Sequence, residues 1–235
     1  MKRIIKISLI LLLVGMAVIA AVPFLKEKRA EKKYENDFKN IQESVIEKKS
    51  DVNGLVKKNK DCIGYVEIPG TTISYPVMQT KDKPDFYLNH DFNRNYSFYG
   101  TPYLSAYCDV NKSDNLIIYG HNINGGKMFG ALEQYKDKKF FNKHRKMYFT
   151  TDKKREYEVF AVMSVNIHEF EYWKFVMARD AKEYDEFVDK VEEHSLWRQG
   201  NKPKYGEQMM MMSTCDNGKG DDWRIVVIGK EIFLK

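Results

Sequence analysis

The fold of this 235-residue chain is decided by two apolar stretches, Met209-Met210-Met211-Met212-Ser213-Thr214-Cys215 and Arg224-Ile225-Val226-Val227-Ile228. Each stretch is short and bounded by polar residues, which predicts a buried β-strand. The nine-residue step from Cys215 to Arg224 leaves room for a loop that turns the chain back. We therefore expect the thiol at the end of the first strand to lie beside the guanidinium at the start of the second.

A third apolar strand is predicted upstream, in the segment Asn115-Leu116-Ile117-Ile118-Tyr119-Gly120-His121-Asn122. This strand ends close to the imidazole of His121. A thiol, an imidazole and a permanent cation, each at a strand end, are the groups from which a cysteine acyl-transfer site is built. For such a site, His121 must come from a strand that packs near the other two.

These motifs resemble the active site of the sortases, and of class B in particular. Of the family's Thr-Leu-x-Thr-Cys motif, Ser213-Thr214-Cys215 matches the second half, while the first half differs. Tyr119 to Asn122 match the Tyr-Gly-His-Asn context of the family histidine, and Arg224 to Val227 match the strand that the family arginine opens. Tyr75 to Gln79 match a Tyr-Pro-Val-x-Gln segment typical of class B. The resemblance runs from about Gly64 to Lys230.

The resemblance implies a mostly β fold with added helices: a closed sortase-type β-barrel, N-terminal helices and a helix between late strands. Sequence patterns agree with a strand-rich body that begins near Asp61. A helix is predicted over Asp180 to Ser195, with Asp180 and Glu183 spaced as in a capping box. The other predicted elements are strands at 63–68, 72–77, 102–108, 116–119, 146–150 and 156–165, a turn at Pro69-Gly70, a loop at Gly125-Gly126 and a short helix from Met128.

The resemblance also implies the chemistry. Cys215 attacks the carbonyl of a threonine in a C-terminal sorting signal and forms a thioacyl-enzyme. His121 protonates the departing amine and later deprotonates the incoming one. Arg224 stabilises the oxyanion or holds the substrate backbone. Asp216, Asp221 and Asp222 lie close in sequence and offer a carboxylate as a rival third member.

Four further residues are candidates for substrate binding: Ser213, Thr214, Asp216 and Asn89. Ser213 is two residues before Cys215 and so shares its face of the strand. The alternative role for Ser213 is a strand hydroxyl bonded to the backbone, and for Asp216 a turn residue in Asp216-Asn217-Gly218. Asn89 resembles a groove residue of class B.

The N-terminus predicts a membrane segment. Ile7 to Leu25 are almost wholly apolar, and nineteen helical residues reach about 28 Å, close to the thickness of a bilayer core. We interpret 1–25 as a signal-anchor, 26–58 as a basic juxtamembrane helical segment and 59–235 as the catalytic domain. The alternative is a cleaved signal peptide. Basic residues after the run favour the opposite orientation by the positive-inside rule, whereas the resemblance implies an extracellular catalytic domain. A stripe of Tyr34, Phe38, Ile41 and Val45 predicts an amphipathic helix.

The formal net charge of +6 is confined to the N-terminus. Residues 1–33 hold eight Lys or Arg and two Glu, and the remainder holds 31 residues of each sign. The balanced charge of the remainder argues against nucleic-acid binding. The basic N-terminal flank either contacts anionic lipid head groups or is a solvated linker. The partners implied by the resemblance are surface proteins with a sorting signal and a peptidoglycan amine.

The other cysteines and the histidines give no sign of a metal or cofactor. Cys62 and Cys108 lack a motif context and are interpreted as core residues, with a disulfide between them left open. The remaining histidines, His90, His144, His168 and His194, show no ligand-like spacing. We therefore expect neither metal nor cofactor.

Three alternative functions remain from the sequence. A hydrolytic cysteine peptidase would use the same residues but release its acyl group to water. A pilin-polymerising sortase would take a lysine of another protein as its amine. A membrane-anchored binding protein with a decayed site is disfavoured by the intact Cys215, His121 and Arg224.

Overall fold

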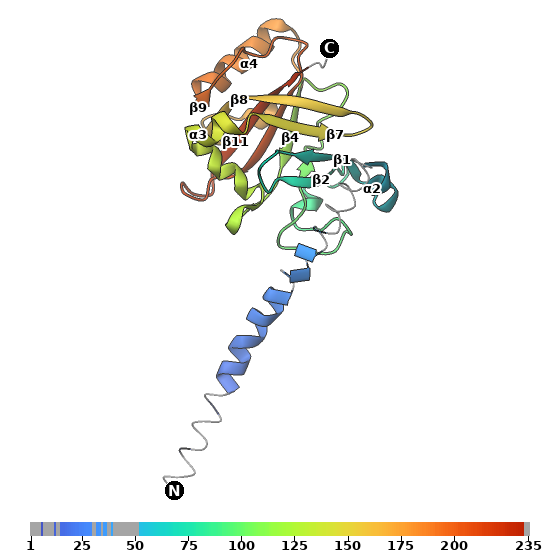
Figure 1. Cartoon of the computed structure of the whole chain (residues 1–235), viewed down its shortest axis with the longest axis vertical. Coiled ribbons are helices and arrows are strands. Elements are labelled where there is room, and N and C mark those ends of the chain that lie inside the picture. The colour runs from blue at the N-terminus through green and yellow to red at the C-terminus, as the bar shows by residue number, and fades with distance from the viewer. Residues whose placement is uncertain are drawn as a thin grey trace. The chain divides into compact units, whose positions relative to one another are not determined.

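The structure is a computed structural model that describes residues 6, 12, 15–29, 32–33, 35–36, 39 and 52–232. The chain separates into two compact units, Met1–Lys49 and Ser50–Lys235. The described residues of the first unit are helical. All strands of the described residues belong to the second unit, and Figure 1 labels many of its elements.

The predicted membrane segment lies in the first unit. Among the described residues, no helix combines the length and the apolar character that a membrane crossing requires. Residues 7–11, 13 and 14 of the predicted span lie outside the described residues. The same holds for the whole amphipathic stripe: Tyr34, Phe38, Ile41 and Val45.

Strand β10 (Met209–Cys215) lies in the interior of the sheet. It pairs in parallel with β4 (Asn115–Tyr119) on one side and antiparallel with β11 (Trp223–Ile232) on the other. Its first six residues are buried. A strand that is covered on both faces reads as a continuous apolar run, which is the physical reason why the methionine stretch has no polar alternation.

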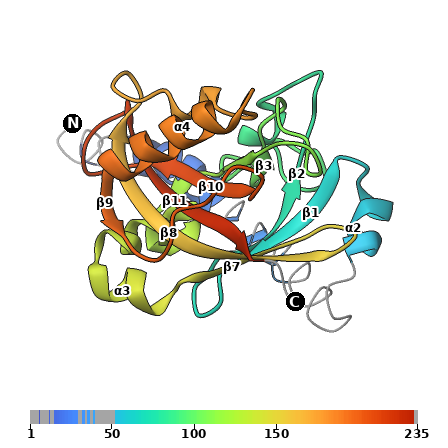
Figure 2. The same ribbon diagram turned by 90° about the horizontal axis from the view of Figure 1, so that it is seen from above.

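The sheet closes on itself into a barrel, as predicted. The strand order is β11-β10-β4-β3-β2-β1-β7-β8, and β8 pairs again with β11, so eight strands of the described chain form a ring (Figure 2). β9 pairs with β8 beyond the end of β7, and β5 and β6 form a separate hairpin. The bounds are β1 (Cys62–Glu67), β2 (Ser74–Met78), β3 (Tyr103–Leu104), β5 (Asn122–Ile123), β6 (Lys127–Met128), β7 (Lys146–Thr150), β8 (Lys154–Asn166) and β9 (Ser195–Arg198).

The predicted turn between β1 and β2 is confirmed. Gly70 has a φ of 77°, and the Thr71 N–H donates to the Ile68 carbonyl at 3.2 Å. Proline followed by a residue with positive φ is the signature of a type II turn, and glycine adopts that φ without strain. The turn sets the antiparallel register that begins with Glu67 opposite Ser74.

Helix α4 (Ala181–Glu193) lies along β8 and β9 on the outside of the barrel (Figure 1). The Asp180 carboxylate accepts the Glu183 N–H at 2.9 Å, so Asp180 caps the helix as predicted. The reciprocal bond of a capping box differs, because the Glu183 carboxylate accepts the N–H of Arg179 instead of that of Asp180. The predicted buried face is confirmed: Tyr184, Phe187, Val188 and Val191.

Several elements differ from the prediction. β3 covers only two residues, because the chain turns where the Cys108 N–H donates to the Ser105 carbonyl at 3.0 Å. Ser195 belongs to β9 rather than to α4; its hydroxyl donates to the Val191 carbonyl at the end of the helix. Helix α2 (Val52–Lys58) lies within the predicted helical segment 26–58, whereas α3 (Lys138–Lys143) was not predicted. The 3-10 helices are η1 (Phe86–Leu88), η2 (Asn124–Gly126), η3 (Phe129–Lys136) and η4 (Tyr172–Lys174).

Candidate active site

Cys215 and Arg224 lie directly opposite each other on neighbouring strands. In the antiparallel pair of β10 and β11, Cys215 is the register partner of Arg224. Residues paired in this way point to the same face, with Cβ atoms about 4.5–5.5 Å apart. Cys215 and Arg224 therefore lie side by side on the two strands, as expected.

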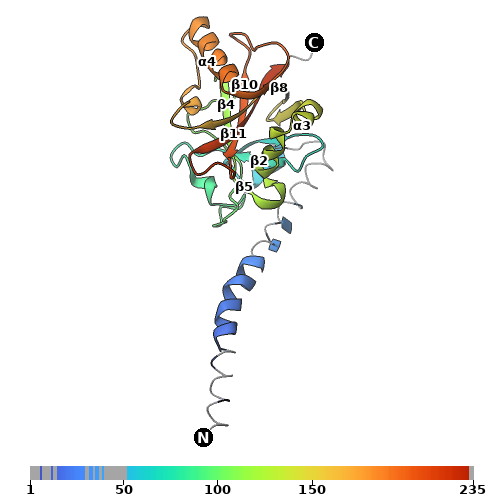
Figure 3. The ribbon, with the colours of Figure 1, turned by 90° about the vertical axis from the view of Figure 1, so that its left-hand side faces the viewer.

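His121 reaches the same end of the barrel from β4. The parallel register pairs Ser213 with Tyr119, and two further residues along each chain bring His121 beside Cys215. Hydrogen bonds continue the pairing past the last ladder residue. The Gly120 N–H donates to the Ser213 carbonyl at 3.2 Å, and the Thr214 hydroxyl donates to the Gly120 carbonyl at 2.7 Å. In Figure 3 this end of β4 lies toward β5, which follows His121 in the chain.

The His121 ring is oriented by the loop that contains η1. Its Nε2 lies 2.8 Å from the Leu88 carbonyl oxygen, and its ring is parallel to that of Phe98, with centroids 6.4 Å apart. A carbonyl only accepts hydrogen bonds, so Nε2 is the donor in this contact. This contact with Leu88 could not be predicted from local sequence patterns, because it joins residues 33 positions apart.

Arg224 fixes the turn that joins β10 to β11. Its Nη1 donates to the carbonyls of Asp221 and Trp223 at 2.5 and 2.9 Å. The Asp216 N–H donates to the Trp223 carbonyl at 2.9 Å, which closes the loop behind Cys215. The guanidinium is thus anchored through one nitrogen, at the end of the barrel where the thiol lies.

The rival carboxylates do not contact His121. Asp221 and Asp222 are exposed, and the Asp222 carboxylate lies 3.6 Å from Nε2 of a different histidine, His168. Within residues 52–232, no hydrogen bond or ion pair joins a carboxylate to the His121 ring. This geometry favours Arg224 over an aspartate as the third group.

Asp216 differs from the expected groove residue. It is fully buried, and its carboxylate accepts hydrogen bonds from Lys136 Nζ at 2.5 Å and from the Ser164 hydroxyl at 2.6 Å. Side chains alternate along extended chain, so Asp216 points away from the face of Cys215. Burial opposes ionisation of this carboxyl, but the bonds from Lys136 and Ser164 outweigh it and hold its pKa below the ordinary value.

The hydroxyls of Ser213 and Thr214 are also engaged inside the protein. Both residues are buried, and the Ser213 hydroxyl lies 2.7 Å from the hydroxyl of Tyr172, while that of Thr214 donates to Gly120. Ser213 thus differs from the expected substrate-binding role, and also from the alternative, because its partner is a side chain rather than the backbone. Burial raises the pKa of Tyr172 to about 12, so its hydroxyl stays neutral. Tyr172 was missed because it lies 41 residues from Ser213 in the chain.

Asn89 is exposed and follows η1 directly. Its carbonyl accepts the Ser97 N–H at 2.9 Å, which folds the loop that carries Phe98 back toward it. Asn89 is also the next residue after Leu88, whose carbonyl meets the His121 ring. The loop thus brings Asn89 to the neighbourhood of His121, where its role in substrate binding stays a prediction.

Cys62 and Cys108 are core residues, as expected. Both are buried with free thiols. Burial raises the pKa of Cys62 to about 12 and that of Cys108 to about 11. Only the thiolate is a good nucleophile, so the half-buried Cys215 is the cysteine suited to attack.

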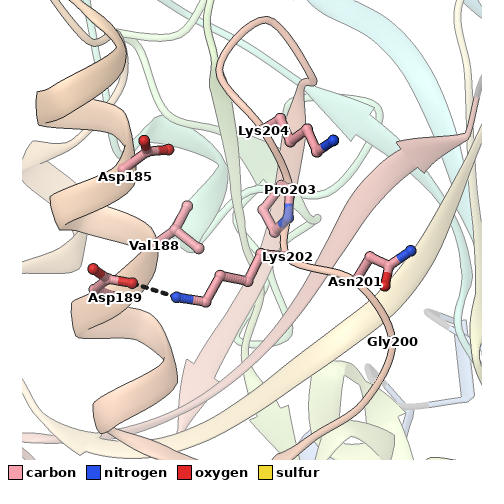
Figure 4. Close-up of a pocket in the computed structure, with 8 residues that line it drawn as sticks. All are labelled: Asp185, Val188, Asp189, Gly200, Asn201, Lys202, Pro203 and Lys204. Carbon is pink, nitrogen blue, oxygen red and sulfur yellow. Dashed lines mark hydrogen bonds and ion pairs between the residues drawn. The ribbon is translucent and has the colours of Figure 1, made fainter.

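A separate pocket of about 720 Å³ lies between α4 and the loop that leads into β10 (Figure 4). The Lys202 side chain extends across it, and its Nζ lies 2.5 Å from the Asp189 carboxylate. This loop precedes the first residue of β10, whereas Cys215 ends the strand. The pocket therefore contributes no group to the site of Cys215, His121 and Arg224.

Comparison with known proteins gives concordant matches. The pattern of the sortase domain family matches residues 66–232. Sortase B of Listeria monocytogenes is 31% identical over 78% of this chain and 75% of its own length. Sortase B of Staphylococcus aureus is 28% identical over 99% of this chain and 98% of its own. A solved structure described as the Staphylococcus aureus sortase B-substrate complex has a TM-score of 0.79, with 26% identity over 87% of this chain and 99% of the other.

Proposed function

Because the chain belongs to the sortase family, in its class B of cysteine transpeptidases, we propose that it joins surface proteins to peptidoglycan. In this proposal it cleaves a C-terminal sorting signal after threonine and transfers the new carboxyl end to a cell-wall amine. The observation that carries the proposal is the meeting of Cys215, His121 and Arg224 at the ends of three adjacent strands. No metal or cofactor takes part in the reaction as proposed.

The first half-reaction forms the thioacyl-enzyme. The Cys215 thiolate attacks the carbonyl carbon of the threonine, and the negative charge moves to the carbonyl oxygen. Arg224, already anchored through Nη1, offers the remaining donors of its planar fork to that oxygen. The tetrahedral intermediate collapses as its C–N bond breaks, and protonated His121 delivers a proton to the departing amine.

The second half-reaction transfers the acyl group. The incoming amine attacks the thioester carbon while neutral His121 accepts its proton. The C–S bond breaks, the Cys215 thiolate is regenerated, and an amide links the two substrates. In the structure the His121 ring contacts Leu88; we propose that it turns toward the thiol when substrate fills the site, since catalytic hydrogen bonds often tighten only in the complex.

Among the predicted substrate-binding residues, we propose direct contact for Asn89 alone. It is exposed and lies on the loop that orients His121. Ser213, Thr214 and Asp216 are buried and act by shaping the strand end from within.

We also propose that residues 1–25 anchor the enzyme in the cell membrane, with residues 59–235 outside the cell. The support is the apolar run Ile7 to Leu25 with Lys2, Arg3 and Lys6 before it. In this proposal, residues 26–58 link the anchor to the domain, and their basic residues lie near anionic head groups.

A library experiment tests the function. The full-length chain in detergent is incubated with sorting-signal peptides and a panel of amines, and products are identified by mass. Ligated peptide is expected with at least one amine. Cleavage without ligation under every amine would identify a hydrolytic peptidase, and ligation only to lysine of a protein would identify a pilin-polymerising enzyme.

A further inference from the structure

The Asn122 side chain joins the strand of His121 to the main chain of the nucleophile. Its Nδ2 donates to the Cys215 carbonyl at 2.7 Å and to the Glu133 carboxylate at 2.8 Å. An amide nitrogen has two hydrogens, and both neighbours are pure acceptors, so the chemistry fixes the amide orientation. Asn122 directly follows His121. One side chain therefore connects the candidate base and the candidate nucleophile.

Glu133 is itself held in place by charge. Its Oε1 also accepts the Asn217 N–H at 3.2 Å, and its Oε2 lies 2.5 Å from Lys136 Nζ. The same ammonium contacts the buried Asp216 carboxylate at 2.5 Å. We call Asn122, Glu133, Lys136 and Asp216 the rear network, because Asp216 points away from the face that carries the thiol.

The rear network ties together three separate segments. Asn122 begins β5, Glu133 and Lys136 belong to η3, and Asp216 follows the end of β10. Asp216 is fully buried, while the side chains of Glu133 and Lys136 are 28% and 33% exposed. Partly buried ion pairs of this kind are screened less by salt than surface pairs. The hydrogen bonds and ion pairs of the network hold these side chains in place on the face of the sheet opposite to the thiol.

We propose that Asn122, oriented by Glu133, is a positioning residue that holds the main chain of Cys215 at a fixed place relative to His121. This inference rests on the proposed function of Cys215 and His121. A displacement of about 1 Å between reacting groups costs on the order of 10²-fold in rate. The contact from Asn122 to the Cys215 carbonyl restrains that displacement directly.

The test uses the full-length chain with the peptide and amine that the wild type turns over fastest in the library. Asn122→Asp has nearly the same shape but replaces both donors with acceptors. We expect kcat to fall about 10- to 100-fold while KM for the peptide stays within about twofold. Asn124→Asp is the matched control: it is exposed on the same loop and should keep wild-type kcat.

A swapped pair separates positioning from folding. Asn122→Asp combined with Glu133→Gln keeps the net charge and returns a donor–acceptor contact between 122 and 133, but no donor to the Cys215 carbonyl. Rates are measured at a temperature at which circular dichroism shows every variant folded. We expect the swapped pair to regain melting temperature and to keep the low kcat.

Two results overturn the inference: wild-type kcat in Asn122→Asp, or recovery of kcat in the swapped pair. Failure of the proposed function looks different. In that case the wild type itself forms no acyl adduct on Cys215 with any peptide of the library, whatever residue stands at 122.

Discussion

Arg224 offers a planar fork of five donors, of which Nη1 already binds the carbonyls of Asp221 and Trp223. A lysine keeps the charge but brings one compact ammonium, which does not hold the turn and an oxyanion together. For Arg224→Lys we expect single-turnover acylation to fall about 10²- to 10³-fold, with little change in melting temperature. Rapid-quench mass analysis measures the rate.

The controls for Arg224 are the nearby carboxylates. Asp221→Asn and Asp222→Asn change exposed side chains and leave the main-chain carbonyl of Asp221 in place, so each should keep most of the activity. The assignment is wrong if Arg224→Lys stays near wild type while a folded Asp→Asn variant is inactive; the site would then be a Cys-His-Asp triad.

The three thiols differ in burial, and the rate at which each is alkylated should be lower for the more buried thiols. With pKa values of about 12 and about 11, Cys62 and Cys108 hold about one thiolate per thousand molecules or fewer at pH 8. We therefore expect iodoacetamide to alkylate Cys215 first in the folded protein, as measured by peptide mapping over time. Equal labelling of Cys62 or Cys108 before unfolding would contradict this ordering.

Ionisation of Asp216 should make the free energy of unfolding depend on pH in the acidic range. Its pKa in the folded state is lowered by Lys136 and Ser164 against the effect of burial, while the unfolded chain has the ordinary value. The stabilisation is thus complete above the unfolded pKa, near 4, and is lost as pH falls through the lower folded pKa. Urea unfolding measured from pH 7 to pH 3 should show this loss. In Asp216→Asn the free energy of unfolding should fall less steeply with falling pH.

The matched control for the acid dependence is Asp222→Asn, an exposed carboxylate in the same loop. It should leave the slope of stability against pH close to that of the wild type. Equal slopes for Asp216→Asn and the wild type would show that the contact with Lys136 does not stabilise the fold.

At the scale of the element, short-range signals were predictable from the sequence. Lys146–Thr150 is a strand with the predicted bounds, and the Asp180 cap and the buried face of α4 follow from local spacing. β3 was predicted too long because the chain turns after Leu104, where the Cys108 N–H donates to the Ser105 carbonyl, and no glycine or proline marks that turn in the sequence. The helix α3 was not predicted, because its six residues are too few to show a helical period.

For the site as well, local contacts could be predicted from the sequence and long-range contacts could not. Cys215 and Arg224 were placed together from one loop length, because a hairpin is a local structure. The parallel register of β4 against β10, the Leu88 contact with His121 and the pairing of Lys136 with Asp216 join residues far apart in the chain. Such contacts depend on the closed barrel, and no local pattern encodes them.

The cap of α4 gives a test of an element. Asp180→Ala removes the acceptor for the Glu183 N–H, and we expect a loss of about 1 kcal/mol in the free energy of unfolding. Asp185→Ala, an exposed change on the same helix, is the control and should cost less. Urea denaturation measures both. A smaller loss for Asp180→Ala than for Asp185→Ala would contradict the assigned cap.

At the scale of the whole molecule, the proposed anchor predicts where the enzyme is found. Full-length protein should sediment with membranes, and protease added to intact protoplasts should degrade residues 59–235. Removing residues 1–25 should release the protein from the membrane fraction without loss of turnover. Protection of the intact domain inside the protoplasts would overturn the proposed topology and the cell-wall role together.

The central claim is that Cys215 carries the acyl group between the two substrates. The most direct measurement is intact-mass analysis of the protein after single turnover with an intact sorting peptide and no added amine. We predict an adduct equal to the N-terminal part of the peptide, present in Cys62→Ala and Cys108→Ala and absent in Cys215→Ala, and discharged when amine is added. An adduct that persists in Cys215→Ala, or turnover by that variant, would contradict the claim.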